Sequence, residues 1–262
     1  MSDETQNFVL GAGKLYFDAF DANGNVTGER YLGDTPGFEV TIETENLEKW
    51  GSDSAIAEKL KDVTTQVTRN TTIQCDNISD DNLELFVIGD LQTVSSSAAS
   101  VEDESLGTVL ASRYYQLGVS ASVPTGVRDI ENVVVHDGST AATAYTLGTD
   151  YTVDLTLGRI HVLPDGALAG NAAFVDYDTT AGSRTQVLSS DTAPQSGALR
   201  FIADNTEGDN RDLYAPNVQL RPNGAMAFKS RDTWQQMQFV AELLVSGQKS
   251  AVYIDGRQVA SS

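Results

Sequence analysis

Two carboxylates, Glu39 and Glu43, are the first residues whose types and spacing could support catalysis. Glycoside hydrolysis uses a pair of carboxyl groups, one as general acid and the other as nucleophile or general base. The surrounding residues, Phe38–Glu45, begin with alternating apolar and polar types, which predicts a strand with one buried and one solvated face. Both glutamates fall on the solvated face, where acidic residues are common without a catalytic role, so we do not predict an active site here.

Other candidate sites are also incomplete. Gly11-Ala12-Gly13 is similar to part of a phosphate-binding loop, but a strand pattern follows it instead of a helix. Asp21–Asn25 begins like a calcium loop but lacks the later glutamate, and its Asn-Gly pair favours a β-hairpin turn. His136 and His161 are the only histidines; without a cysteine partner or a third histidine we expect ordinary strand residues and no zinc site. No serine lies in a Gly-x-Ser-x-Gly motif, so we predict a non-enzymatic protein without cofactor or metal.

The elements that would position functional residues are strands. A β-hairpin is predicted for Phe38–Gln74, formed by Phe38–Glu45, a second strand over Asp62–Gln74 and a charged loop, Asn46–Lys61, between them. A hairpin loop of this length is unusual and often functional. Trp50 lies in this loop, and a tryptophan in a polar loop is a candidate anchor for a protein interface. The alternative is that Trp50 folds back onto the core of its own chain.

One face of the predicted hairpin is polar along both strands. Its residues are Glu39, Thr41, Glu43 and Glu45 on the first strand and Gln66, Thr68, Asn70, Thr72 and Gln74 on the second. The chain has a formal net charge of −20, and residues 1–110 contain 21 of its 37 acidic residues but only 6 of its 17 basic ones. A surface of this sign repels phosphate, so ordinary nucleic-acid binding is not expected. Composition leaves two explanations open: a surface for solubility, or one that prevents adhesion to DNA.

The remaining segments predict a mainly β protein with one short helix. The helix is expected over Ser79–Gly89, whose first residue can cap it, and Leu91–Leu110 is expected to be a flexible connector or exposed loop. Short strands separated by turns indicate a separate all-β module over Val119–Gln186, and longer strands resume after it. We therefore predict one discontinuous domain, residues 1–118 and 187–262, into which this module is inserted. The chain has no apolar run near the roughly 18 residues that a membrane-spanning helix needs, so no membrane association is expected.

The order of these segments resembles the major tail tube protein of long-tailed (siphovirus-type) bacteriophages. The strand Gly37–Glu45 and the segment Asp212–Gly224 carry most of the resemblance, which covers about residues 7–90 and 195–245. The second segment reads Asp212-Leu213-Tyr214-Ala215-Pro216-Asn217-Val218-Gln219-Leu220-Arg221-Pro222-Asn223-Gly224. The Asn-Gly hairpin, the long charged loop, the Thr- and Gln-rich strand and the capped helix add to it. The module over Val119–Gln186 departs from the minimal family pattern, and we interpret it as an insertion on the outer surface.

This resemblance implies a β-barrel or sandwich with a flanking helix, of which six copies close into a ring and rings stack into a tube. The lumen conducts the genome during ejection, so DNA passes in transit and is not specifically bound. Implied partners are other copies of the chain, the tape measure protein and the tail terminator and tip proteins, in a virion assembled in the host cytoplasm. The residues expected to line the lumen are Glu39, Thr41, Glu43, Glu45, Gln66, Thr68 and Asn70. Those expected at the subunit or ring interface are Leu47, Trp50, Ile56 and Leu60.

Two other classes of function stay open. A virion decoration or adhesin-type protein would use the middle β module to bind a host surface. An acidic carbohydrate-active enzyme would depend on a carboxylate pair and is the third hypothesis. Stacked rings or tubes seen by electron microscopy would support the tail-tube class, whereas a protein that never assembles would favour the other two.

Overall fold

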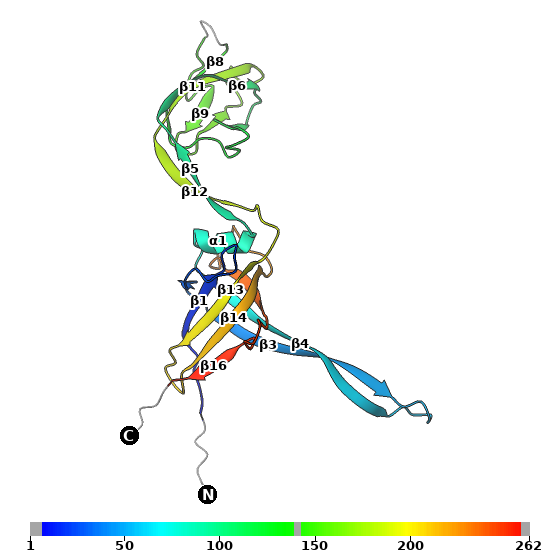
Figure 1. Cartoon of the computed structure of the whole chain (residues 1–262). Helices are drawn as coiled ribbons and strands as arrows, with labels where there is room; N and C mark the ends of the chain where they lie inside the picture. Colours follow the sequence, from blue (N-terminus) through cyan, green and yellow to red (C-terminus); the bar gives the residue numbers. More distant parts are fainter. Residues whose placement is uncertain (1–6, 139–142, 258–262) are drawn as a thin grey trace. The chain divides into compact units, whose positions relative to one another are not determined.

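The computed structural model describes residues 7–138 and 143–257 (Figure 1). The chain divides into two compact units. The main unit contains the chain up to Leu91 and from Val187 onward, and the inserted unit is Gln92–Gln186. The protein is mainly β, and the described residues contain one short helix, which confirms the predicted fold class. None of the helical residues in these ranges forms a helix long and apolar enough to cross a membrane.

The main unit is built on an eight-stranded sheet. Its order is β2-β1-β13-β14-β15-β4-β3, and β16 also pairs with β14. The strands are β1 (Gly13–Ala19), β2 (Arg30–Tyr31), β3 (Gly37–Trp50), β4 (Lys59–Cys75), β13 (Gln195–Ala203), β14 (Arg211–Pro222), β15 (Met237–Leu243) and β16 (Tyr253–Gly256). Neighbouring strands are antiparallel, so every ladder can be formed without a crossover helix.

The turn after β1 confirms the hairpin prediction for Asp21–Asn25. The Asp21 carboxylate accepts hydrogen bonds from the backbone N–H groups of Asn23 and Asn25, both at 2.8 Å. Gly24 has a φ of 80°, in the left-handed region that glycine tolerates best. These contacts close a tight turn between strands. The Asp21 carboxylate, which would be a calcium ligand in a calcium loop, accepts hydrogen bonds from the turn instead.

The hydrophobic core of the main unit lies on one face of its sheet. Leu15, Ile73 and Phe239 are almost completely buried and belong to a single cluster. Phe38 of β3 stacks on Phe201 of β13, with ring centroids 5.4 Å apart, although these strands are not neighbours in the sheet. The sheet therefore curves around its core in a barrel-like way. Among the strands that the structure describes, no ladder joins β2 to β3, so both remain edge strands.

The helix α1 (Asp80–Val87) packs on this core and begins as predicted. The Ser79 hydroxyl accepts the backbone N–H of Asn82, which satisfies one free amide of the first turn. The helix ends at Ile88, which adopts a left-handed φ of 51°, one residue before the glycine expected to stop it. Gly89 lies one residue further on, at a position with no room for a side chain, because an added Cβ would lie 1.8 Å from the carbonyl oxygen of Leu188.

The inserted unit has its own core. It contains all or part of three small sheets. Their orders are β7-β10-β9, β6-β11-β8 and β12-β5. The strands are β5 (Asp90–Ser96), β6 (Ala99–Thr108), β7 (Tyr114–Gln116), β8 (Ile130–His136), β9 (Tyr151–Asp154), β10 (Arg159–Val162), β11 (Ala172–Thr179) and β12 (Gly182–Leu188). Buried residues such as Val135, Ile160 and Val175 form a cluster separate from the core of the main unit.

One predicted domain boundary is wrong. The inserted unit begins at Gln92, whereas the predicted start is Val119; its end at Gln186 agrees with the prediction. The segment Leu91–Leu110, expected to be a flexible connector, contains most of β5 and all of β6. Its Ser, Ala and acidic residues form strands because β6 pairs with the distant β11 and β5 pairs with β12.

Candidate functional site

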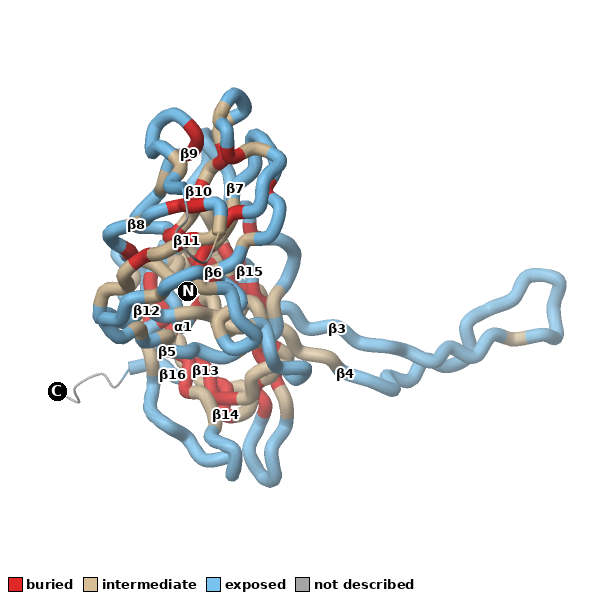
Figure 2. Tube along the Cα trace, turned by 90° about the horizontal axis from the view of Figure 1, so that it is seen from above, coloured by how far each residue is buried: buried red, intermediate tan, exposed pale blue. Residues whose placement is uncertain are grey.

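The β3–β4 hairpin is longer than the sheet that carries it. β15 pairs with β4 only from Asn70 to Cys75. Beyond Asn70, β3 and β4 have no other strand partner among the described residues and pair with each other out to their ends. Figures 1 and 2 show this part as two strands that project from the sheet, with most residues exposed. We call residues 42–69 the ribbon.

Much of the predicted loop Asn46–Lys61 is strand. β3 continues to Trp50 and β4 begins at Lys59, so the connection between them is residues 51–58. Register shifts after Glu45 and Lys49 allow the two strands to stay paired along this region. The prediction of a long loop is therefore wrong in its boundaries, because cross-strand pairing continues through a charged sequence that does not alternate cleanly.

The seven residues predicted to line a lumen lie together on one face of the hairpin. Glu43 is the direct partner of Thr68, and Glu45 is the direct partner of Gln66. Thr41 is opposite Asn70 in the same way, and Glu39 precedes Thr41 on the same face. Direct partners in an antiparallel pair point to the same side, so the strands form a continuous strip of carboxylates, amides and hydroxyls. Their role in lining a lumen stays a prediction.

The polar strip continues onto the sheet through residues that were not predicted to belong to it. Asn70 of β4 is paired with Glu242 of β15, which is paired with Gln219 of β14. The Glu242 carboxylate lies 3.7 Å from the Arg221 guanidinium, so one basic residue partly balances the acidic face. The alternation in β15 could have placed Glu242 on a polar face, but its position beside Asn70 depends on a pairing that spans most of the chain.

The opposite face of the hairpin is more apolar and is also exposed. Val40, Ile42 and Val67 lie on it, and all three are exposed. Val40 and Ile42 lie on β3, whose outer edge has no strand partner among the described residues. An exposed apolar face beside an open strand edge is typical of a surface that becomes covered in an assembly.

The four predicted interface residues lie at the outer end of the ribbon or in its connection. Leu47, Ile56 and Leu60 are 69%, 80% and 65% exposed, and Trp50 is 49% exposed. The Trp50 indole N–H donates a hydrogen bond to the Glu48 carboxylate at 3.1 Å. The alternative that Trp50 folds back onto the core is therefore wrong. Its contact with other subunits stays a prediction.

Lys59, the cross-strand partner of Trp50, forms ion pairs with two carboxylates. The Lys59 ammonium group donates to the carboxylates of Glu48 at 2.6 Å and Asp62 at 2.8 Å. The hydrogen bonds, led by the one to Asp62, raise the pKa of Lys59 above its ordinary value. Glu48 thus receives hydrogen bonds from both Lys59 and Trp50, which orients the indole ring at the end of β3.

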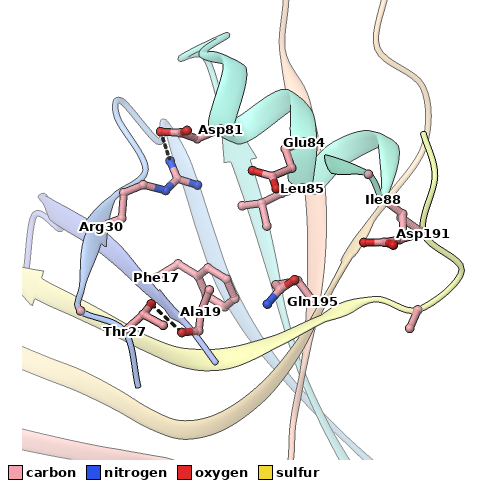
Figure 3. A pocket seen from close by; sticks show the side chains of 13 residues that line it. Phe17, Ala19, Thr27, Arg30, Asp81, Glu84, Leu85, Ile88, Asp191 and Gln195 are labelled. Carbon is pink, nitrogen blue, oxygen red and sulfur yellow. Dashed lines mark hydrogen bonds and ion pairs between the residues drawn. The ribbon is translucent and has the colours of Figure 1, made fainter. Parts of the chain in front are cut away.

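A cavity of about 360 Å³ lies beside α1, but its lining does not indicate a reaction (Figure 3). The Arg30 guanidinium lies 3.9 Å from the Asp81 carboxylate and donates a 2.8 Å hydrogen bond to the Asn82 side chain. Burial raises the pKa of Glu84, and the negative charge of Asp81 adds to this shift. The described lining contains no histidine, cysteine or serine, and its Thr27 hydroxyl donates to a backbone carbonyl. We identify no nucleophile–base pair in this cavity.

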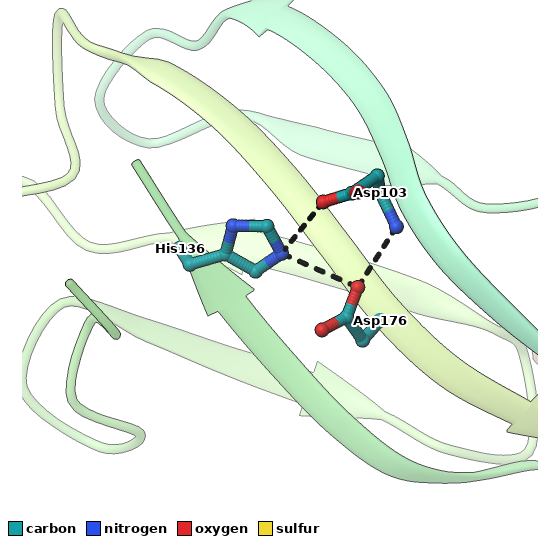
Figure 4. A group of neighbouring side chains, drawn as sticks. All are labelled: Asp103, His136 and Asp176. Carbon is teal, nitrogen blue, oxygen red and sulfur yellow. Dashed lines mark hydrogen bonds and ion pairs between the residues drawn. The ribbon is translucent and has the colours of Figure 1, made fainter. Parts of the chain in front are cut away.

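The two histidines differ in their surroundings. His161 lies in β10 and stacks on Tyr114, with ring centroids 4.2 Å apart, as an ordinary strand residue would. His136 ends β8, and its Nε2 atom lies 3.6 Å from Asp103 Oδ1 and 3.3 Å from Asp176 Oδ1 (Figure 4). The backbone N–H of Asp103 donates to Asp176 Oδ1 at 2.8 Å, which holds the pKa of Asp176 below its usual value. The sequence spacing of these residues does not reveal their proximity.

Comparison with known proteins gives a match to one family model. No curated protein matches the chain. A family model matches residues 8–253, a range that includes the hairpin, the rest of the sheet except its last residues, and the inserted unit. Because this match covers most of the sequence, the chain belongs to the family described as "Protein of unknown function UCP028589".

Proposed function

We propose that this protein is a structural subunit of a phage tail tube, in which rings of the chain stack and an acidic lumen conducts DNA. The observation that carries the proposal is the ribbon, residues 42–69, which leaves its sheet as two strands. Several kinds of assembly could bury the ribbon. The resemblance of Gly37–Glu45 and Asp212–Gly224 to tail tube proteins favours the tail tube among them.

The low stability expected of an unsupported ribbon favours assembly. An isolated two-stranded hairpin is marginally stable in water unless a further strand or a packed layer supports it. The ribbon also exposes apolar side chains, including Leu47, Ile56 and Leu60. Contact with another copy of the chain would bury these side chains and provide the missing support. Strand addition at the free edge of β3 would satisfy its backbone groups in the same way.

The charge of the polar strip favours a surface past which DNA moves. Glu39, Glu43 and Glu45 project from one face beside neutral amides and hydroxyls. Carboxylates repel phosphate groups within roughly one Debye length, about 8 Å at physiological ionic strength. A ring of such strips would keep DNA from adhering, and the net charge of −20 per chain adds to the effect.

Assembly of the purified full-length chain tests this proposal. Negative-stain electron microscopy at increasing protein concentration should show rings or tubes of uniform bore, and native mass spectrometry should show a sixfold species. Leu60→Asp should prevent assembly because it replaces an apolar side chain at the proposed interface with a charged one. Leu147→Asp is the matched control, since Leu147 is 61% exposed and lies in the inserted unit. A chain that stays monomeric at every concentration would contradict the proposal.

The inserted unit provides the observation that favours a second candidate function. Its own buried cluster, with Val109, Leu117 and Leu168 among its members, makes it a compact module. A decoration or adhesin-type protein would use such a module to bind a host surface. Labelling of virions with an antibody against the chain distinguishes the two functions, because a tail tube subunit would be located along the tail only.

A further inference from the structure

Three strands of the inserted unit bring two carboxylates to one imidazole. In the sheet β6-β11-β8, Asp103 belongs to β6, Asp176 to the central β11 and His136 to β8. One ligand atom from each residue lies within 4.8 Å of the other two. Figure 4 shows the imidazole Nε2 directed toward both carboxylates. No other group of three such residues is this close in the part of the chain that the structure describes.

An irregularity in the β6–β11 ladder places Asp103 in this group. Val101 is paired with Tyr177 and Glu104 with Val175, so two residues of β6 face the single residue Asp176. Asp103 has a φ of 58°, a left-handed conformation that aspartate tolerates better than most residues. Bulges of this kind redirect a side chain and are common next to functional sites.

His136 is almost completely buried and presents Nε2 to two carboxylates. Its side chain is 7% exposed, and Nδ1, which has no hydrogen-bond partner among the described residues, lies on the other side of the ring (Figure 4). Nε2 can donate only one proton, yet it faces oxygens of both Asp103 and Asp176. A metal ion held between Nε2 and the two carboxylate oxygens would interact favourably with all three, because imidazole nitrogen and carboxylate oxygen are common ligands of transition metals.

We propose that Asp103, His136 and Asp176 bind a divalent transition-metal ion, with Zn²⁺ as the reference ion. Bonds of 2.0–2.2 Å from zinc to nitrogen and oxygen place tetrahedral ligands about 3.3–3.6 Å apart. The distances from Nε2 to the two carboxylate oxygens, 3.6 and 3.3 Å, match this spacing. Calcium prefers six to eight oxygen ligands, whereas a mixed nitrogen and carboxylate set suits a first-row transition metal.

The site leaves room for a ligand from outside the chain. The side chains of Asp103 and Asp176 are 44% and 42% exposed, so the coordination positions opposite His136 face solvent. Three protein ligands and an open position are typical of sites at which a metal binds water or an external group. The backbone N–H of Asp103 orients the Asp176 carboxylate, as outer hydrogen bonds commonly do for metal ligands.

A metal at this position would join β6, β11 and β8 and would bind whether or not the chain assembles. The test uses the full-length protein after treatment with a chelator, titrated with Co²⁺ and followed by its visible absorption, then with Zn²⁺ by calorimetry. Asp103→Asn removes a ligand charge and keeps a residue type that tolerates positive φ. Glu102→Gln is the matched control, because it removes a charge at the adjacent exposed position.

We expect one ion per chain in the wild type and in Glu102→Gln, with zinc displacing cobalt. Affinity should fall at least about tenfold in Asp103→Asn and in His136→Gln. Circular dichroism checks that each variant is folded, and Asp103→Asn carries the test if the buried His136 cannot be replaced. Absence of saturable binding to the wild type, or equal affinity in Asp103→Asn, would overturn the proposal.

Discussion

The β3–β4 hairpin has two parts, the root (residues 37–41 and 70–75) and the ribbon, which contain similar residues in different surroundings. In the root, Ile73 is fully buried between β3 and β15. In the ribbon, Ile42 lies on the same pair of strands and is 59% exposed. The difference is β15, whose pairing with β4 ends at Asn70. An alternating strand pattern thus predicts which side chains share a face, but a neighbouring element decides whether that face is buried.

The comparison also separates stability from assembly. Burial of apolar surface contributes about 25 cal/mol per Å², and the root obtains this contribution within one chain. The ribbon can obtain it only from another molecule, because its apolar side chains remain exposed in the single chain. We therefore expect substitutions in the root to lower the free energy of unfolding and substitutions in the ribbon to weaken association.

The largest expected effect is on Ile73. Replacing this buried residue with alanine should lower the free energy of unfolding by about 2–5 kcal/mol, because it removes buried methyl groups and leaves a cavity. Ile42→Ala, the same change at an exposed position, should alter it by less than about 0.5 kcal/mol. Urea denaturation of dilute protein measures both. Similar losses in the two variants would contradict the difference between root and ribbon.

The next effect is on assembly and concerns Trp50. Trp50→Ala should raise the protein concentration needed for ring or tube formation by at least about tenfold, because buried tryptophans often contribute 2 kcal/mol or more to an interface. The free energy of unfolding should change little, since Trp50 is half exposed and lies at the outer end of the ribbon. Light scattering against concentration measures assembly.

Trp234→Ala is the control for this prediction. Trp234 is the other tryptophan of the chain; it is 90% exposed and lies outside the ribbon. The Trp234→Ala variant should assemble at the same protein concentration as the wild type if the interface lies on the ribbon. Assembly that depends on Trp234 and not on Trp50 would move the interface to the segment between β14 and β15.

The sequence predicts the faces of the hairpin because this information is local. The two-residue period of a strand places Glu43 and Glu45 together, and the same period places Gln66 and Thr68 together. Their pairing across the hairpin follows once both strands are recognised. The helix start was predictable for the same reason, since the Ser79 cap bonds to a residue only three positions away.

The features that the sequence does not predict depend on distant partners. The segment Leu91–Leu110 has the composition of a loop, but β11 pairs with β6 and makes it a strand. Glu242 joins the polar strip only because β15 lies beside β4. The group around His136 needs three strands and a bulge to bring its members together. None of these pairings has a signal in local periodicity.

A smaller effect is expected from the charge of the polar strip. Glu43→Lys should leave folding unchanged, because the residue is exposed, but assembled particles should retain DNA at low salt. Retention should disappear as the salt concentration rises, which is the signature of phosphate contacts. Glu58→Lys makes the same charge change in residues 51–58 and should retain less DNA. Equal retention by both variants would indicate that total charge matters and that the strip has no special position.

The smallest effect concerns the order of the ribbon near Trp50 as the pH changes. Hydrogen bonds to Asp62 and Glu48 raise the pKa of Lys59 in the folded chain. Their stabilising effect is therefore complete below the ordinary pKa of lysine and is lost as the pH rises through the raised value. Because Lys59 is exposed to solvent, the change should loosen the ribbon without unfolding the sheet.

Fluorescence anisotropy can isolate this effect in the Trp234→Phe variant, which retains Trp50 as its single tryptophan. The anisotropy should fall at alkaline pH as Lys59 loses its proton and the support of Glu48 weakens. Adding Lys59→Met should lower it at neutral pH and remove the pH dependence, whereas Lys61→Met should change neither. If the anisotropy is unaffected by Lys59→Met, the order of the ribbon end does not depend on this ion pair, and cross-strand pairing alone maintains it.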